Sequence, residues 1–257
     1  MAGNRMAVVS SDGILYQYQS LASDPVLDQT TVLSEVLSLD ELHSLKFSAS
    51  GQELLLIQRR STVPVTGIDV ETGKVLFRID ARTETPTDCY CAIMSSDSSM
   101  LALGLGNDVI LVDQVAGDRN VLSGHRSTVT ALCFLSHGAT LISASSDRTI
   151  RIWDLKTQTT THVMTGHSDP IDRIALTDDG KCLLSISTRA EVCLWNVASG
   201  HVLTILQSSI EGSTNQNIWS YGFVDLRPNR PLRARLIIDW PALRTNLKTK
   251  HFTGGRK

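Results

Sequence analysis

The stretch LSGHRSTVTALCFLSHGATLISASSDRTIRIWD, residues Leu122–Asp154, contains a Gly-His dipeptide followed 28 residues after the histidine by a tryptophan. A second stretch, GHSDPIDRIALTDDGKCLLSISTRAEVCLWN, aligns with it without a gap from Gly166 to Asn196. The two histidines are 42 residues apart, and so are the two tryptophans. A sequence that repeats itself at a period of about 40–45 residues indicates a repeat architecture.

The two copies resemble WD40 repeats, which carry Gly-His near their start and Trp-Asp near their end. The resemblance implies an all-β protein, a WD40-type β-propeller in which each repeat forms a four-stranded blade. Within the first copy, polar turn sequences separate three runs rich in β-branched and aliphatic residues. We expect strands at Val129–Leu135, Thr140–Ser145 and Thr149–Trp153. A fourth strand is expected after Trp-Asp.

Three weaker copies precede these two, and Tyr18 and Val112 stand where a tryptophan is expected. Their expected strands are Met6–Val9, Ile14–Tyr18, Leu45–Phe47, Glu53–Ile57, Val65–Asp69, an outer strand Val70–Ile79, Cys91–Met94, Met100–Leu105 and Val109–Asp113. Residues 1–206 are therefore predicted to form about five recognisable blades. Propellers have roughly 4–8 blades, and the family mostly closes with about seven. We expect either an incomplete ring or one completed by partial blades or a partner.

The resemblance implies a buried hydrogen-bond network in each repeat, made by the Gly-His histidine, a serine of the second strand, an aspartate of the next turn and the tryptophan. In the first copy, these residues are His125, Ser143 or Ser145, Asp147 and Trp153. In the second copy, they are His167, Ser185 and Trp195. Arg189 occupies the aspartate position there, and since arginine cannot accept a proton from histidine, we expect a weaker network.

Catalysis is not expected, because the residues that resemble a hydrolase triad, His125, Ser143 and Asp147, already have a structural role in the repeat. The sequence has no phosphate-binding glycine loop and no C-x-x-C pair. Gly104-Leu105-Gly106 is a fragment of a glycine motif within an expected strand, which predicts a close-packing site. We therefore expect a non-enzymatic protein with no catalytic residue, metal, cofactor or small-molecule ligand.

Protein partners are expected at the end of the propeller where the Gly-His loops lie. The network places the Gly-His loop and the turn between the second and third strands at the same end, and the residues beside them should face solvent. This predicted rim comprises Arg126, Ser127, Thr128, Ser146 and Arg148 from one blade and Ser168, Asp169, Thr188 and Arg189 from the next. Such faces bind partners through a few anchors, among which arginine is prominent.

Two narrower functions remain as alternatives to a general scaffold that assembles a multiprotein complex. Trp153-Asp154-Leu155-Lys156 resembles the W-D-x-[RK] ending of a box in WD40 substrate receptors of cullin-RING ubiquitin ligases, in which the basic residue helps to contact the adaptor. The other alternative is a scaffold in ribosome biogenesis or RNA processing, for which a basic tail would be suitable.

The C-terminal segment 207–257 differs in composition from the repeats and is expected to be partly disordered. Residues 212–257 carry nine Lys or Arg against two Asp, a net charge of +7, which leaves −9 for residues 1–211. Such a tail is either a solvated terminus or a nucleic-acid contact. The candidate contacts are Arg227, Arg230, Arg233, Arg235, Lys248 and Lys250.

Composition indicates an intracellular protein, cytoplasmic or nuclear. The N-terminus lacks a secretory signal pattern, and no apolar run approaches the ~20 residues of a membrane span. The five cysteines are an odd number, and three of them lie in apolar strand patterns, which disfavours an oxidised scaffold.

Overall fold

A computed structural model describes residues 4–9, 14–20, 25–32, 42–80, 88–135, 138–177 and 179–207, with side chains between residues 42 and 205. The chain divides into two units, Met1–Ser208 and Ser209–Lys257. The second unit lies outside the described residues, and with it the six predicted nucleic-acid contacts of the tail. None of the described residues is helical.

The described strands form five antiparallel sheets that follow one another along the chain. Sheet 1 has β1 (Asn4–Val9), β2 (Ile14–Ser20) and β3 (Pro25–Val32). Sheet 2 has β4 (Leu42–Phe47), β5 (Glu53–Gln58), β6 (Val65–Asp69) and β7 (Val75–Ile79). Sheet 3 has β8 (Cys89–Met94), β9 (Met100–Leu105), β10 (Asp108–Asp113) and β11 (Arg119–Leu122). Sheet 4 has β12 (Val129–Phe134), β13 (Thr140–Ser145), β14 (Thr149–Asp154) and β15 (Thr159–Thr165). Sheet 5 has β16 (Ile171–Leu176), β17 (Cys182–Ser187), β18 (Glu191–Asn196) and β19 (Val202–Gln207).

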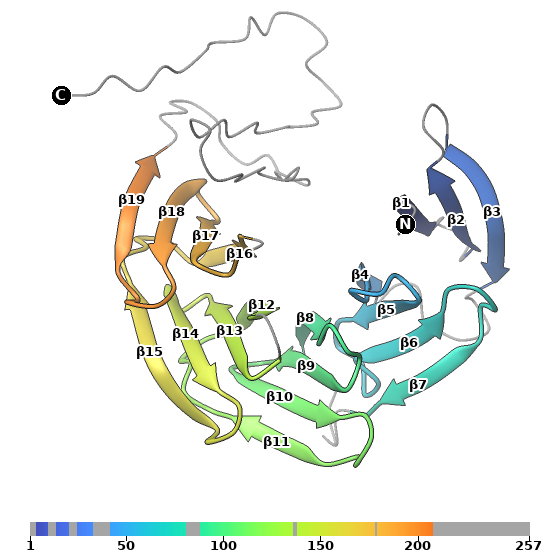
Figure 1. The fold of residues 1–257 in the computed structure, drawn as a ribbon, viewed down its shortest axis with the longest axis horizontal. Helices are drawn as coiled ribbons and strands as arrows, with labels where there is room; N and C mark the ends of the chain where they lie inside the picture. Colours follow the sequence, from blue (N-terminus) through green and yellow to red (C-terminus); the bar gives the residue numbers. More distant parts are fainter. Residues whose placement is uncertain are drawn as a thin grey trace, which may run out of the picture. The chain divides into compact units, whose positions relative to one another are not determined.

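Sheets 2–5 are complete propeller blades. In each, neighbouring strands in the chain pair with one another, and Figure 1 shows β4, β8, β12 and β16 on the inner side and β7, β11, β15 and β19 on the outer side. The all-β fold and the WD40-type blade predicted from the repeats are thus confirmed.

Sheet 1 contains three described strands, and its register identifies which ones they are. In sheets 2, 4 and 5, a bulge lies between the third and fourth strands, and in sheets 4 and 5 it falls beside Trp153 and Trp195. The bulge between β2 and β3 falls beside Tyr18, which identifies β2 as a third strand and β3 as a fourth. Tyr18 therefore has the register position of the tryptophan, and no described strand fills the innermost position of this sheet.

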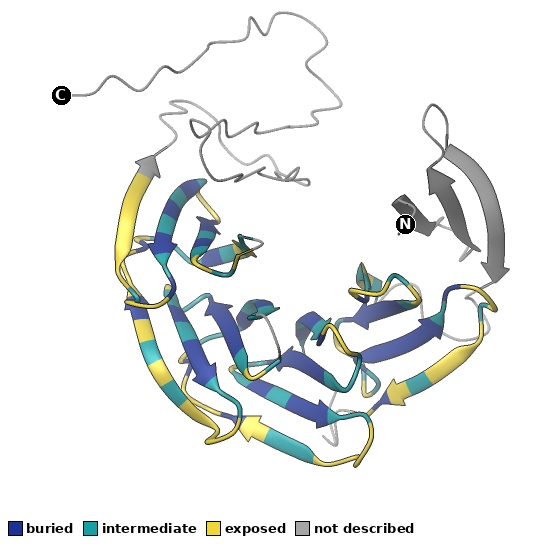
Figure 2. Cartoon of the chain, in the orientation of Figure 1, coloured by how far each residue is buried: buried dark blue, intermediate teal, exposed yellow. Residues whose placement is uncertain are grey.

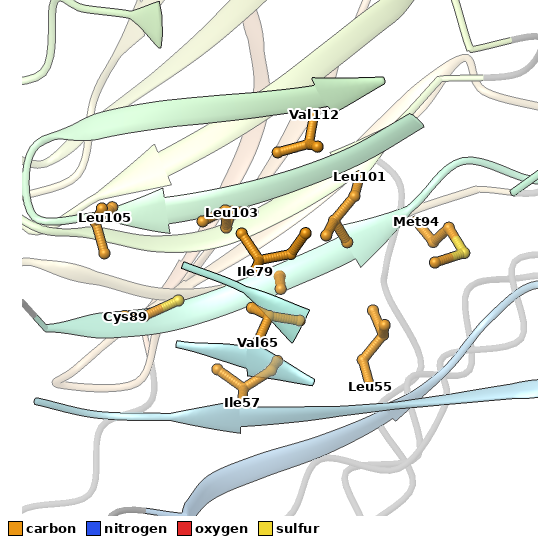
Figure 3. Close-up of a cluster of buried hydrophobic side chains, with 11 residues drawn as sticks. Leu55, Ile57, Val65, Ile79, Cys89, Met94, Leu101, Leu103, Leu105 and Val112 are labelled. Carbon is orange, nitrogen blue, oxygen red and sulfur yellow. The ribbon is translucent and has the colours of Figure 1, made fainter. Parts of the chain in front are cut away.

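Buried aliphatic side chains join neighbouring sheets, because each middle strand is covered on both faces. One cluster packs Leu55 and Val65 of sheet 2 against Leu101 and Leu103 of sheet 3 (Figure 3). Similar clusters join sheet 3 to sheet 4 and sheet 4 to sheet 5. Among the strand residues of sheets 2–5, most of the exposed ones lie in the outermost strands (Figure 2). Hydrophobic burial between sheets is therefore the main source of stability.

Gly104 of sheet 3 lies against Val129 of sheet 4. A Cβ atom there would lie 2.7 Å from Cys91 Sγ and 2.9 Å from Val129 Cβ, closer than real Cβ contacts. This confirms the predicted close-packing site.

The predicted outer strand Val70–Ile79 is wrong in its first half. Thr72 donates its backbone N–H and its hydroxyl to Asp69 Oδ1 at 2.6 and 2.7 Å, and Gly73 has a φ of 69°. Asp and Gly at these positions favour a turn. Strand β7 therefore begins only at Val75.

Candidate functional site

Sheet 4 brings together the polar residues of the predicted network. His125 precedes β12, Ser143 lies in β13, Asp147 lies in the next turn and Trp153 lies in β14. His125 Nδ1 is 2.9 Å from Asp147 Oδ2, and His125 Nε2 is 2.8 Å from Ser143 Oγ. Trp153 Nε1 donates to the same Ser143 Oγ at 2.8 Å. Of the two candidate serines, the geometry places Ser143 in the network, whereas the Ser145 hydroxyl donates to a backbone oxygen.

The partners of His125 determine where its proton lies. Asp147 can only accept a hydrogen bond, so the ring proton is on Nδ1 and the Ser143 hydroxyl donates to Nε2. Asp147 is held by three further donors: the backbone N–H (2.9 Å) and hydroxyl (2.7 Å) of Thr149 and the backbone N–H of Arg126 (2.9 Å). Every polar atom of the histidine ring is therefore paired inside the sheet.

Burial determines the charge states of this network. It lowers the pKa of His125 below the ordinary value of 6.5, although Asp147 acts in the opposite direction. Burial by itself would raise the pKa of Asp147, but the hydrogen bonds from Thr149, Arg126 and His125 outweigh it and lower this pKa to about 2. A neutral histidine beside an ionised aspartate follows.

The depressed pKa of Asp147 predicts a stability difference that depends on pH. Because the folded pKa is about 2 and the ordinary value is 3.8, the ionised carboxylate stabilises the fold above 3.8, and this contribution is lost as pH falls toward 2. Urea unfolding of the wild type and of Asp147→Asn measures it. The difference in unfolding free energy is expected to be constant near neutral pH and to shrink below 3.8. A difference that does not change with pH would contradict the assignment.

Sheet 5 builds the same network with a different acid. His167 Nε2 is 2.6 Å from Ser185 Oγ, and Trp195 Nε1 donates to that oxygen at 2.7 Å. The carboxylate belongs to Glu191, whose Oε2 is 2.8 Å from His167 Nδ1. The same Oε2 accepts the backbone N–H of Ser168 at 3.0 Å. Burial tends to raise the pKa of Glu191, but these hydrogen bonds lower it overall.

The expectation that Arg189 weakens this network is therefore wrong. Glu191 is 24 residues after His167, at the position of Thr149 in sheet 4, and its longer side chain reaches the histidine from the first residue of β18. The Arg189 side chain is 81% exposed and lies 3.4 Å from Asp169. Glu191 was missed because only the aspartate position was considered.

The nine predicted rim residues lie in the loops before the innermost strands of sheets 4 and 5 and in the turns between the second and third strands. In antiparallel sheets these loops and turns are at the same end, which we call the Gly-His end of the sheets. The exposed members are Arg126, Arg148, Ser168, Thr188 and Arg189. The partly buried members are Ser127, Thr128, Ser146 and Asp169. Arg148 donates to the backbone oxygen of Ser168 at 3.5 Å, which links the loops of the two sheets.

Most described arginines outside the middle of strands lie at the Gly-His end, whereas the lysines of turns lie at the opposite end. The described arginines at the Gly-His end are Arg59, Arg60, Arg126, Arg148, Arg173 and Arg189. The described lysines that lie outside strands are in turns at the opposite end, at Lys74, Lys156 and Lys181. One arginine, Arg119 at the start of β11, also lies at that end. Arg59 is held in place, because it donates to the Tyr90 hydroxyl at 2.6 Å and lies 4.4 Å from the centroid of that ring.

The predicted ligase-adaptor contacts do not form one exposed surface. Trp153 is buried in the network, with 2% exposure. Asp154 Oδ1 accepts the backbone N–H groups of Lys156 and Thr157 at 2.8 and 2.9 Å, and so holds the turn after β14. Of the three residues, Lys156 is exposed, at the end opposite the predicted rim.

The sequence of this chain is similar to one repeat family and to several known proteins. A family profile described as "WD domain, G-beta repeat" matches residues 118–154. A WD repeat-containing protein 89 homolog from Dictyostelium discoideum is 37% identical over 71 residues, which cover 27% of this chain and 20% of that protein. Pre-mRNA-processing factor 17 from Saccharomyces cerevisiae is 35% identical over 118 residues, which cover 44% of this chain and 25% of that protein.

A solved structure of U3-55K shares the fold, with a TM-score of 0.57 and 20% identity, covering 65% of this chain and 52% of that chain. Together with the four-stranded sheets and their buried His-Ser-Trp networks, these similarities define the class as a β-propeller repeat protein. The chain carries a WD40 repeat at residues 118–154 and is similar in sequence to WD-repeat proteins. It spans a quarter or less of the two relatives named above. Among the described residues, no helix is long and apolar enough to cross a membrane.

Proposed function

We propose that this chain is a non-enzymatic scaffold that binds protein partners at its Gly-His end and so assembles a multiprotein complex. The observation that carries the proposal is that six described arginines gather at the Gly-His end, whereas the turns at the opposite end carry the described lysines that lie outside strands. Protein interfaces are enriched in arginine and tyrosine and depleted in lysine. The Gly-His end presents six described arginines, and Tyr90 packs against Arg59 there.

A scaffold also accounts for the polar residues that resemble a hydrolase triad. Ser143, His125 and Asp147 have the hydrogen-bond order of such a triad. However, Ser143 is 0% exposed, and its Oγ accepts the indole N–H of Trp153. A nucleophile must reach a substrate carbonyl, so these contacts favour a structural role over a catalytic one.

Charge reversal at the Gly-His end tests the proposal. Arg126→Glu/Arg148→Glu/Arg189→Glu is expected to lower the recovery of co-purifying proteins at least about tenfold, which corresponds to about 1.4 kcal/mol of binding energy. Quantitative mass spectrometry after affinity purification from cells measures the recovery. Lys74→Glu/Lys156→Glu/Lys181→Glu is the matched control, with the same charge change at the opposite end. Loss with the control triple alone would place the partners at the lysine-bearing end and contradict the proposal.

A role in RNA processing is a second candidate, favoured by the name of the pre-mRNA-processing factor 17 relative. In this version, the basic residues of segment 212–257 contact RNA and the location is nuclear. Deleting that segment is then expected to abolish RNA binding that weakens with salt. RNA binding that is unchanged by the deletion would contradict this version.

A further inference from the structure

Three potential metal ligands converge in sheet 5. Among the described residues, His167, Glu191 and Cys193 form a group whose ligand atoms all lie within 4.8 Å of one another. His167 Nδ1 is 2.8 Å from Glu191 Oε2 and 3.8 Å from Cys193 Sγ. All three residues are buried, with Cys193 at 0% exposure. An imidazole nitrogen, a carboxylate oxygen and a thiol sulfur are the three ligand types that zinc accepts in proteins.

Comparison with sheet 4 shows which residues around the histidine differ in sheet 5. The histidine, serine and tryptophan are the same in both sheets, but Glu191 replaces Thr149 and Cys193 replaces Arg151. Arg151 lies 5.9 Å from the ring of Trp153 and places a cation near His125 in sheet 4. Sheet 5 therefore has no arginine at the position of Arg151 and has two potential ligand side chains, Glu191 and Cys193, instead.

Hydrogen bonding around His167 also permits a metal at Nδ1. A metal there requires the ring proton to move to Nε2, which then donates to Ser185 Oγ. Ser185 must give its own proton to another acceptor, because Trp195 Nε1 already donates to it. The backbone oxygen of Cys193 lies 3.5 Å from Ser185 Oγ and provides that acceptor. The histidine can thus change tautomer with every group paired.

We infer that His167 Nδ1, Glu191 Oε2 and Cys193 Sγ form a buried binding site for a thiophilic divalent cation, Zn²⁺. Zinc bonds of about 2.0–2.1 Å to nitrogen or oxygen and about 2.3 Å to sulfur place tetrahedral ligands roughly 3.3–3.6 Å apart. The observed separations from His167 Nδ1 are 2.8 and 3.8 Å, and all three ligand atoms lie within 4.8 Å of one another, so shifts of about 0.5 Å for the first pair and about 1 Å at most for the others bring them to that range. Ser185 and the backbone N–H of Ser168 orient the ligands from outside.

Binding releases one proton. The Nδ1 proton of His167 is replaced by one on Nε2, and the Cys193 thiol gives its proton to solvent as the sulfur bonds to zinc. Burial, and secondarily Glu191, raises the pKa of this thiol to about 11, so it stays protonated without a cation. The sequence pattern missed this site because its cysteine has no C-x-x-C partner.

Zinc binding to the purified full chain tests the inference. Titration with Zn²⁺ against a chromophoric chelator is expected to give one tight site per chain and a higher melting temperature. Cys193→Ser should lower the affinity at least about 100-fold, because it removes a ligand. Cys182→Ser is the matched control: its cysteine lies in the same sheet, outside the ligand group, and the variant should bind like the wild type.

Wild-type zinc ligation gives a second readout that does not depend on how any variant folds. X-ray absorption of the zinc-loaded wild type is expected to show one sulfur, with nitrogen and oxygen completing the shell. The inference is overturned by two or more sulfur ligands, by no stoichiometric binding, or by equal effects of the two cysteine variants.

Discussion

Replacing Trp153 by alanine is expected to lower the free energy of unfolding by about 3–5 kcal/mol, the range found when a buried aromatic side chain is truncated. Trp153 is 2% exposed and packs with Leu132 and Leu141 between sheets 3 and 4. Its removal leaves a cavity there and takes one donor from Ser143. Urea unfolding followed by circular dichroism measures the loss.

Trp153→Phe separates packing from hydrogen bonding in this prediction. Phenylalanine keeps most of the ring and removes the indole N–H, so the expected loss is smaller, about 1–3 kcal/mol. If Trp153→Ala and Trp153→Phe cost the same, the hydrogen bond to Ser143 Oγ would account for the whole effect, and the packing argument would be wrong. If neither costs more than about 0.5 kcal/mol, the tryptophan is not part of a cooperative core.

The period of the repeat was sufficient to predict the sheets, since strand pairing within a blade is local in sequence. Even the weak first copy, which has Tyr18 at the tryptophan position, has the strand order and bulge of a propeller blade. The error at Val70–Ile79 has the same local origin. An Asp-x-x-Thr-Gly segment folds into a turn through its own side chains, which an apolar pattern on either side conceals.

Contacts between residues of different repeats could not be predicted from the sequence. Arg59 directly follows β5 of sheet 2, and Tyr90 lies 31 residues later in β8 of sheet 3. Neither belongs to a Gly-His motif, so the rim prediction omitted them. The sequence did not identify Glu191 and Cys193 as site residues, for another reason. Each departs from its counterpart in sheet 4, and only the three-dimensional arrangement shows that both departures face the same histidine.

Replacing Glu191 by alanine is expected to lower the free energy of unfolding by about 2–4 kcal/mol, because the buried His167 Nδ1–H and the partly buried Ser168 N–H lose their acceptor. Chemical unfolding of the zinc-free chain measures this loss. Arg189→Ala is the control: its guanidinium is 81% exposed, and the surface ion pair with Asp169 should contribute less than about 1 kcal/mol.

Moving the acid to the position it has in sheet 4 provides the decisive comparison. Glu191→Thr alone should be destabilised nearly as much as Glu191→Ala. Arg189→Asp/Glu191→Thr reproduces the Asp147 and Thr149 arrangement and should recover most of the loss, because the aspartate can accept from His167 and Ser168 as Asp147 does from His125 and Arg126. If the double variant is no more stable than Glu191→Thr, the two sheets do not share one network.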